Sequence, residues 1–361
     1  IVVMNNPLYS DPELEHQFND SGAKALITMD LLVKRMVALR SKTKVKQIVY
    51  TSIGDYLPAV KRILGRWLKK YPFADVEPAA DVFSWKECLG KYAPNPPAVK
   101  IGFEDVAMYQ YTGGTTGVSK GVMLTHANLS KQVQQLKAWF PKFEPGTEIM
   151  LGALPYFHVF GLSTTMNYSI YMGFAQGLVP RPQPEPLLEA IRLYRPTFAP
   201  LVPTMYIGML NHPDLKKTDM SCIKGAFSGS APLPVEVIHD FEKATGAVIV
   251  EGFGMTETTP VTHINPFAGG ARKVGSVGIP IPDTLARIVD LEDEVTDVPV
   301  GERGELIVKG PQIMLGYKGK PEETAKTLRD GWIYTGDIAT MDEDGYFYIV
   351  DRKKDMIISG G

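Results

Sequence analysis

The sequence predicts an α/β protein that carries a β-rich unit near its end, and three observations lead to this prediction. The 361 residues exceed the usual size of a single hydrophobic core, so more than one packed unit is expected. Strand-like and helix-like segments alternate through the first two-thirds of the chain. After about residue 265 that alternation gives way to short strands punctuated by glycine and proline.

The α/β part is predicted from short apolar runs that read as buried strands. These runs are KALIT, QIVY, EIMLGAL, PTFAPLV, KGAFSGS and AVIVEGFG. Amphipathic stretches lie between them, including Asn128 to Phe140 and Pro234 to Thr245. Strands that alternate with helices favour parallel sheets covered by helices. We therefore expect an α/β body over residues 1–264.

The β-rich unit is expected over residues 265–350. Its short strands are GSVGIPIPDTLARIVD, GELIVKG and GYFYIVDR, a spacing that favours a small antiparallel barrel or sheet. A further stretch from Tyr92 to Asp105 is rich in proline, and we interpret it as a surface connection.

Composition excludes several classes of protein. The net charge of −2 arises from 38 basic and 40 acidic residues along the whole chain, so no field of one sign is available to attract nucleic acid. The two cysteines, Cys88 and Cys222, have no metal-ligand spacing and suggest no disulfide framework. We expect a cytoplasmic protein, with peripheral contact with the inner membrane left open.

One segment is long and uncharged enough to raise the question of a membrane span. No Asp, Glu, Lys or Arg occurs over the thirty-two residues from Ile149 to Pro180. Pro155, four glycines and six Ser, Thr, Asn or Gln residues interrupt this segment, and a lipid-exposed helix would carry their polar groups at a cost. A buried αβ segment is the favoured interpretation, and a transmembrane helix is the alternative.

The stretch YTGGTTGVSKG, Tyr111 to Gly121, suggests a phosphate site. The P-loop of nucleotide triphosphatases requires a Gly-Lys-Ser or Gly-Lys-Thr step, but Ser119 precedes Lys120 here and glycine follows it. The dinucleotide fingerprint also fails, because its first two glycines are adjacent here. Two interpretations of the residues alone stay open: an anion-binding nest of amides and hydroxyls, or a glycine-rich hairpin.

The order of five motifs carries a family resemblance. The motifs are YTGGTTGVSKGVMLTHANL, LPYFHVFGL, SGSAPLP, EGFGMTET and YTGDIATMDEDGYFYIVDRKKDMI. Together they resemble the adenylate-forming enzymes, which include acyl-CoA synthetases, luciferases and adenylation domains, and most of all bacterial long-chain fatty-acid–CoA ligases. Ser119 stands where proline is commoner, and Phe253 where tyrosine is commoner.

This resemblance implies a fold and a reaction. The fold would be two stacked mixed sheets flanked by helices, with a small β-barrel-like subdomain. The reaction would activate a fatty acid with ATP to an acyl-adenylate, release pyrophosphate and transfer the acyl group to coenzyme A, with Mg²⁺ as the metal. Residues 351–361 would form a hinge to a carboxyl-terminal domain that lies outside this chain, and the chain would be truncated at both ends.

The resemblance also implies roles for individual residues. The phosphates of ATP would bind Thr112, Gly113, Gly114, Thr115, Thr116, Gly117 and Lys120. Thr256 would donate to the α-phosphate, and Glu257 and Thr112 would be ligands of Mg²⁺; Thr256, Glu257 and Lys120 would be the catalytic residues of this chain. A helix cap formed by the Thr-Glu pair is the structural alternative.

The nucleoside and the acid would lie on either side of these phosphate groups. The nucleoside would contact Gly229, Ser230, Ala231, Phe253, Gly254, Asp337 and Arg352, with Phe253 stacked on adenine and Asp337 accepting from both ribose hydroxyls. The acid would contact Phe157, His158 and Phe160, and Lys354 would be the hinge residue. From the residues alone, the alternatives are a core position for Phe253, a turn at Asp337 and a solvated cluster around Arg352.

Two rival functions stay open. One is adenylation of an aryl, medium-chain or amino acid for transfer to a carrier protein. The uncharged segment from Ile149 to Pro180 argues against an amino acid as the substrate. The other is a non-catalytic module that binds nucleotide or lipid. The resemblance also implies a lysine in the carboxyl-terminal domain that contacts the reacting carboxylate. Without that lysine, this chain by itself is expected to bind ATP and to form little acyl-CoA.

Overall fold

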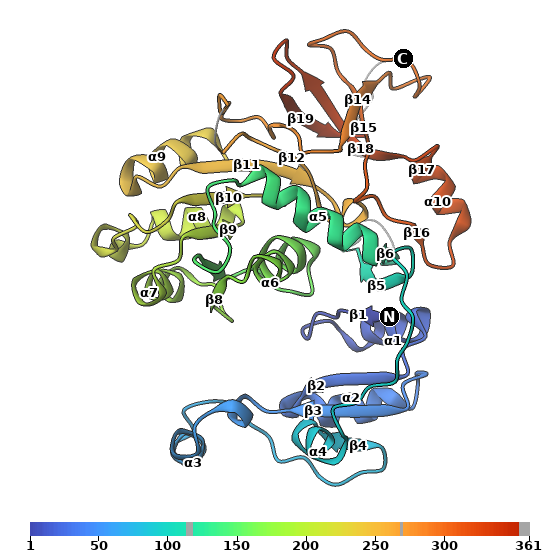
Figure 1. The fold of residues 1–361 in the computed structure, drawn as a ribbon, viewed down its shortest axis with the longest axis vertical. Coiled ribbons are helices and arrows are strands. Elements are labelled where there is room, and N and C mark those ends of the chain that lie inside the picture. The colour runs from blue at the N-terminus through green and yellow to red at the C-terminus, as the bar shows by residue number, and fades with distance from the viewer. Residues whose placement is uncertain (113–117, 268–269, 354–361) are drawn as a thin grey trace. The chain divides into compact units, whose positions relative to one another are not determined.

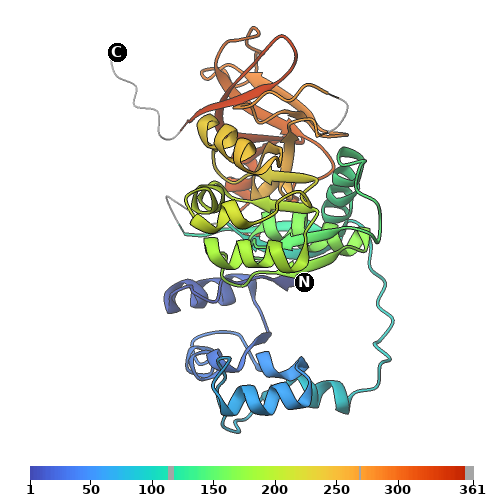
Figure 2. The same cartoon turned by 90° about the vertical axis from the view of Figure 1, so that its left-hand side faces the viewer.

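A computed structural model describes residues 1–112, 118–267 and 270–353, and it separates into two compact units. One unit contains Ile1–Met4 and the chain from Gly102 onward, and the other contains Asn5–Ile101. The proline-rich stretch predicted as a connection leads from one unit to the other. It has neither helix nor strand between Lys91 and Val106, as Figure 2 shows.

The unit of residues 5–101 is a small parallel sheet with short helices. Its strands run in the order β2 (Ala25–Met29), β3 (Gln47–Thr51) and β4 (Val82–Ser84). Its helices are α1 (Asp11–Ser21), η1 (Asp30–Leu32), α2 (Val33–Arg40), η2 (Ile53–Tyr56), α3 (Ala59–Trp67) and α4 (Trp85–Lys91). Leu14 and Phe18 of α1 and Met36 and Leu39 of α2 pack with Ile48 of β3 into its core.

A seven-stranded mixed sheet organises the other unit (Figure 1). Its order is β13 (Ile279–Pro280), β12 (Val261–Ile264), β11 (Ile249–Gly254), β10 (Gly225–Ser228), β9 (Phe198–Leu201), β7 (Ile149–Gly152) and β8 (Ala175–Leu178). The strands from β8 to β11 are parallel, whereas β12 and β13 are antiparallel. All six apolar runs predicted as strands contain a strand. The four in this sheet, β7, β9, β10 and β11, are buried or half-buried, as parallel strands covered on both faces are.

Neighbouring residues of these strands enter two different cores, as the period of two in a strand requires. Leu151, Ala199, Ala226 and Ile249 face a core with α7 (Pro184–Tyr194), α8 (Pro203–Leu210) and α9 (Val235–Thr245). Met150, Phe198, Phe227 and Val250 face another with α5 (His126–Trp139) and α6 (Tyr168–Met172). Helices therefore cover both faces of the sheet, which confirms the α/β prediction.

Two further sheets complete this unit. A four-stranded mixed sheet has the order β1 (Val2–Val3), β5 (Val106–Tyr111), β6 (Gly121–Thr125) and β16 (Gly316–Tyr317). An antiparallel sheet contains β14 (Leu285–Val289), β15 (Gly304–Lys309), β18 (Trp332–Met341) and β17 (Leu328–Arg329), with β19 (Phe347–Arg352) also paired to β18. The mixed and antiparallel sheets agree with the predicted fold class.

The β-rich part is a sheet and not a closed barrel. In the described residues β14 pairs with β15, and at the other side the two-residue strand β17 is an edge of the sheet. A barrel would need the two edges to pair. The short helix α10 (Pro321–Thr327) leads directly into β17.

The uncharged segment from Ile149 to Pro180 has the predicted αβ structure. It contains β7, a π-helix η3 (Gly161–Asn167), α6 and β8. The remaining short helices are η4 (Pro213–Lys217) and η5 (Thr256–Thr258). Among the described residues, no helix has the length and apolarity needed to cross a membrane.

Candidate active site

Lys120 and Glu257, from distant parts of the chain, both contact Tyr317. Its hydroxyl donates to Oε1 of Glu257 at 2.6 Å, and Nζ of Lys120 lies 4.8 Å from the centre of its ring. Burial, followed by the charge of Glu257, raises the pKa of Tyr317 above its ordinary range, so the hydroxyl remains a donor. Lys120 also forms an ion pair with Glu323 of α10. The structure thus joins the cation of the glycine-rich loop to the carboxylate predicted as a metal ligand.

Glu257 is buried, with 7% of its surface exposed. It lies in the 3₁₀ turn η5 after β11, and its carbonyl accepts from the amide of Met314 at 2.9 Å. Thr256 begins this turn, while the capping position is Met255, so the Thr-Glu pair is not the cap that the residues alone also allowed. The turn therefore contains the carboxylate of Glu257 and, next to it in the chain, the hydroxyl of the half-buried Thr256.

Asp337 and Arg352 lie opposite each other on β18 and β19. Nε of Arg352 is 3.2 Å from Oδ1 of Asp337, and only 5% of Asp337 is exposed. Burial raises the pKa of Asp337 to about 6, against the opposing charge of Arg352. Glu257 is near enough to raise that pKa further, so the two acidic residues predicted for the site share one electrostatic environment.

Partly buried polar contacts hold the turn before Asp337. Glu305 accepts from the amide of Gly336 at 3.0 Å and from Nζ of Lys353 at 2.8 Å. The hydroxyl of Thr335 donates to the carbonyl of Leu306 at 2.7 Å and accepts from the amide of Asp337 at 3.1 Å. The carboxylate of Asp337 is therefore placed by β15 and β19 and not by its own turn alone.

The predicted nucleoside residues come from the ends of β10 and β11. Gly229 is buried, whereas Ser230 and Ala231 are exposed. Phe253 is half-buried, and its ring lies 6.2 Å from that of His263 on β12. A Cβ at Gly254 would lie 1.8 Å from the carbonyl oxygen of Pro260, so the strand ends closely against the next segment.

The predicted acid-binding residues approach the same strand ends. A Cβ at Gly229 would lie 3.2 Å from the ring of Phe160, which means that a glycine here allows the two motifs to meet. Phe157 is half-buried, and its carbonyl accepts from the side chain of Gln110. His158 is exposed as a residue, and desolvation by the surrounding protein lowers its pKa below the ordinary value.

Part of the predicted phosphate and hinge residues lies outside the described residues: Gly113, Gly114, Thr115, Thr116, Gly117 and Lys354. The described ends of the glycine-rich loop are held together. The amide of Thr112 donates to the carbonyl of Lys120 at 3.1 Å, and the amide of Lys120 donates to the Thr112 hydroxyl at 3.4 Å. Thr112 and Lys120 are thus neighbours at the base of the loop.

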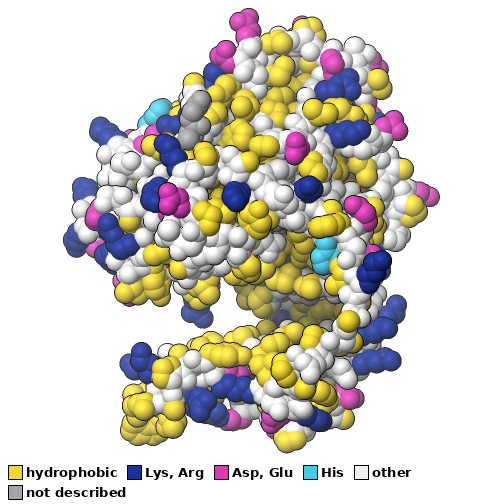
Figure 3. Space-filling model, viewed as in Figure 1, with side chains coloured by type: hydrophobic (Ala, Val, Ile, Leu, Met, Phe, Trp, Pro, Cys, Tyr) yellow, Lys and Arg dark blue, Asp and Glu magenta, His cyan; other side chains and the backbone are white. Residues whose placement is uncertain are grey.

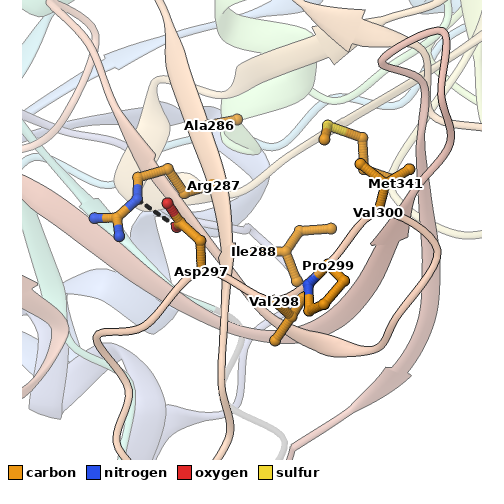
Figure 4. A pocket seen from close by; sticks show the side chains of 8 residues that line it. All are labelled: Ala286, Arg287, Ile288, Asp297, Val298, Pro299, Val300 and Met341. Atoms are coloured by element: carbon orange, nitrogen blue, oxygen red, sulfur yellow. Dashed lines mark hydrogen bonds and ion pairs between the residues drawn. The ribbon is translucent and has the colours of Figure 1, made fainter.

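Two hollows border the antiparallel sheet. The first, of about 210 Å³, is drawn in Figure 4. It is lined by Ala286, Arg287, Ile288, Asp297, Val298, Pro299, Val300 and Met341. The second, of about 470 Å³, is lined by Asp283, Leu285, Lys309, Gly310, Ile313, Met314, Leu328 and Gly331. Neither contains a residue predicted to bind nucleotide or acid, and we assign neither a role in the site.

Sequence reasoning missed four residues of this site: Tyr317, Glu323, Glu305 and Lys353. Tyr317 is 60 positions from Glu257, and Lys120 is 203 positions from Glu323. No spacing rule joins residues so far apart in the chain. The one available signal was Tyr317 in a Gly-Tyr step four residues before Pro321, which starts a helix.

Comparison with known proteins finds relatives that match the whole chain. The chain is 48% identical over 364 residues to a long-chain-fatty-acid–CoA ligase of Bacillus subtilis, and 39% identical over 366 residues to one of Salmonella typhimurium. All of this chain is matched in both cases, and it spans 65% of the length of each relative.

Solved structures give the same result for the fold. ATP-bound MatB from Rhodopseudomonas palustris superposes with a TM-score of 0.84 at 29% identity, over 100% of this chain and 65% of that one. A long-chain-fatty-acid–CoA ligase from Archaeoglobus fulgidus superposes with a TM-score of 0.78 at 28% identity, over 97% of this chain and 67% of that one. The model of the family described as AMP-binding enzyme matches residues 1–318, and the chain therefore belongs to that family.

Proposed function

We propose that the protein activates a long-chain fatty acid with ATP and passes the acyl group to coenzyme A. The observation that carries the proposal is the 48% identity, over the whole chain, to a protein named as a long-chain-fatty-acid–CoA ligase. The grouping of Lys120, Tyr317 and Glu257, and the shared electrostatic environment of Glu257 and Asp337, support it. The unpaired Cys88 and Cys222 support a reducing, cytoplasmic setting.

The reaction would take place in two displacements. A carboxylate oxygen of the acid attacks the α-phosphorus, the bond from that phosphorus to the bridging oxygen breaks, and pyrophosphate leaves. The thiol of coenzyme A then loses its proton and attacks the acyl carbon, and AMP leaves. Both reactants of the first step are anions, so charge neutralisation and positioning are the main tasks of the protein.

Lys120 would supply a positive charge to the β- and γ-phosphates. In the structure its ammonium is paired with Glu323 and lies over the ring of Tyr317. The side chain of Glu323 is 45% exposed, so water can replace the ammonium at little cost when Lys120 turns to a phosphate. The ring of Tyr317 would stay in contact with the ammonium as it moves from Glu323 to the phosphates.

Mg²⁺ would be held by Glu257, with Thr112 as a further oxygen ligand. Mg²⁺ commonly binds one or two protein carboxylates together with substrate phosphates. A buried carboxylate with one hydrogen-bond donor fits this pattern. The described residues contain no group of three or more His, Cys, Asp or Glu able to hold a metal alone, so the phosphates would complete the coordination. The ion would neutralise phosphate charge.

The nucleoside and the acid would lie on the two sides of these phosphates. Asp337 would accept from the ribose hydroxyls, Arg352 would move from Asp337 to ATP, and Phe253 would stack on adenine against the Gly229–Ala231 wall. Phe157, His158 and Phe160 would line the entry of the acyl chain. Gly229 lies directly against Phe160, which supports a continuous path from adenine to acid. Lys354 would be the hinge.

Pyrophosphate exchange tests this function. The intact protein is expected to catalyse ATP–pyrophosphate exchange that depends on a long-chain fatty acid, and then to form the thioester when coenzyme A is added. Short-chain fatty acids and amino acids, offered at the same concentration, serve as controls. Exchange supported equally by an amino acid, or ATP binding with no exchange by any acid, would contradict the proposal.

Aryl acids are the second candidate substrates. A feruloyl-CoA synthase of an Amycolatopsis species is 35% identical over 350 residues, covering 97% of this chain. Its reaction type is the same and only the acid differs. Ferulate therefore belongs in the same exchange assay, and a higher kcat/KM for ferulate than for long-chain acids would favour this alternative.

Tyr317→Phe is expected to lower the rate of adenylation on the order of tenfold, as for the loss of one hydrogen bond to a charged group. The variant keeps the ring beneath Lys120 but leaves Glu257 without its 2.6 Å donor. Tyr348→Phe is the matched control, because its hydroxyl donates to another carboxylate, Asp342, at 3.1 Å. Pyrophosphate exchange measured across magnesium concentrations checks the result. Equal rates in the two variants would mean that Tyr317 does not position Glu257.

A further inference from the structure

Helix α3 has an apolar face that no part of its own unit covers. Val60, Ile63, Leu64 and Trp67 follow the i, i+3, i+4, i+7 spacing of one helical face. Their exposed fractions are 68%, 65%, 49% and 77%, and Leu68 beyond the helix is 52% exposed. No residue of α3 is buried. A helix this strongly amphipathic normally turns its apolar stripe towards a core.

The opposite side of α3 is attached to its unit by Tyr71. A Cβ at Gly65 would lie 2.8 Å from the Tyr71 ring, and one at Gly54 would lie 2.5 Å from its hydroxyl oxygen. The Tyr71 hydroxyl also donates to the carbonyl of Arg62 at 3.0 Å. The two glycines let the ring lie between η2 and α3. The helix is thus held by its polar side, with the apolar stripe facing away.

Basic residues surround the apolar face, and no acidic residue lies between Tyr56 and Ala74. The basic residues are Lys61, Arg62, Arg66, Lys69 and Lys70. Among the described residues, only Arg66 of these five has an ion pair, with Asp75. In Figure 3, hydrophobic side chains gather where Figure 1 labels α3, and Lys and Arg side chains lie beside them.

We propose that α3 binds the surface of an anionic lipid membrane. A short helix with Trp, Leu and Ile on one face and Lys and Arg on the other lies in the membrane interface, where anionic headgroups attract its charges. The excess of positive charge selects lipid over an apolar protein surface as the occupant. Such docking would present the protein to acids that partition into lipid, but its test requires neither ATP nor catalysis.

Vesicle co-sedimentation of the intact protein tests the proposal. We expect binding to vesicles of phosphatidylglycerol and phosphatidylcholine in equal parts, and much weaker binding to phosphatidylcholine alone. Binding to the anionic vesicles should fall with added salt, since the screening length shortens from about 10 Å at 0.1 M to about 3 Å at 1 M. Equal binding to both vesicles, or none to the anionic ones, would overturn the proposal.

Substitutions locate the surface. Ile63→Ser with Trp67→Ser is expected to lower binding to the anionic vesicles on the order of tenfold or more, and Lys69→Gln with Lys70→Gln to weaken it and reduce its salt dependence. Leu193→Ser is the matched control, since Leu193 is 67% exposed on α7, outside the basic cluster. All these side chains are exposed, so folding should be retained, as thermal unfolding can verify. Unchanged binding by the first variant would remove α3 from the interface.

Hydrogen exchange distinguishes lipid from a protein surface as the occupant of the face. The α3 amides should exchange rapidly without vesicles and become protected when anionic vesicles are added. Protection already present without vesicles, and unchanged by them, would show that another part of the protein covers the face, and the proposal would fail. A protein that binds vesicles but lacks pyrophosphate exchange would leave this inference standing and refute the proposed ligase function instead.

Discussion

Glu257→Gln is expected to lower fatty-acid-dependent adenylation on the order of a hundredfold, the scale of losing one charge-stabilising group. The amide has the same shape, so it can still accept from Tyr317, which donates to Oε1 at 2.6 Å in the unsubstituted protein. What it lacks is the negative charge, through which a carboxylate attracts Mg²⁺ more strongly than a neutral amide oxygen does. Pyrophosphate exchange across a range of magnesium concentrations measures both the rate and the metal dependence.

Glu148→Gln is the control for this substitution. Glu148 is also a buried carboxylate, with 1% of its side chain exposed, but its partner is Lys224 at 2.7 Å, away from the predicted site. The control reports what the loss of a buried carboxylate does to folding in general. If Glu257→Gln changes the maximal rate but leaves the magnesium dependence unaltered, Glu257 is not a ligand of the metal.

Asp337→Asn is expected to raise the dissociation constant of ATP on the order of a hundredfold, because two hydrogen bonds to a charged acceptor contribute about 1.5 kcal/mol each. An ionised Asp accepts at both oxygens, whereas Asn accepts at one and donates at the other. Calorimetric titration with ATP and with 2′-deoxy-ATP provides the measurement. The unsubstituted protein should discriminate between the two nucleotides and the variant should not.

The pH dependence follows from the raised pKa of about 6 at Asp337. Ribose hydroxyls need the ionised acceptor, so the ATP affinity of the unsubstituted protein should fall as the pH drops through about 6. Its affinity should then approach that of Asp337→Asn. Asp342→Asn, on the same hairpin, controls for the change in charge. Equal loss of affinity in this control would mean that Asp337 has no specific contact with the nucleoside.

The free energy of unfolding without nucleotide should fall as the pH rises, whereas the affinity for ATP should increase. The native state binds the Asp337 proton more tightly than the unfolded chain does, because burial raises the pKa from 3.8 to about 6. The contribution to the free energy of unfolding is therefore largest in acid and declines by about 3 kcal/mol as the pH rises through the native pKa. Between about pH 5 and about pH 8, about half of this decline, roughly 1.4 kcal/mol, should appear in urea unfolding of the unsubstituted protein and not of Asp337→Asn.

Much of the fold could be read from local patterns. Apolar runs such as AVIVEGFG became strands because a strand buried on both faces needs apolar residues throughout. The uncharged segment from Ile149 to Pro180 was read correctly as αβ because its prolines, glycines and polar residues are incompatible with lipid. The β-rich part was predicted as a barrel or a sheet, and local patterns could not choose between them, since closure depends on pairing between distant edges.

The amino-acid sequence by itself determined the order of the motifs, and through them the family and the chemistry expected of Lys120, Glu257 and Asp337. Only the tertiary structure decided that Tyr317 joins Lys120 to Glu257 and that Glu305 holds the turn before Asp337, because these partners are brought together by pairing of β16 with β6 and of β15 with β18. Helix α3 shows the same limit. Its apolar spacing predicts an amphipathic helix, but a stripe that fills a core and a stripe that meets a membrane have the same period. Burial alone distinguishes them, and burial is a property of the folded chain.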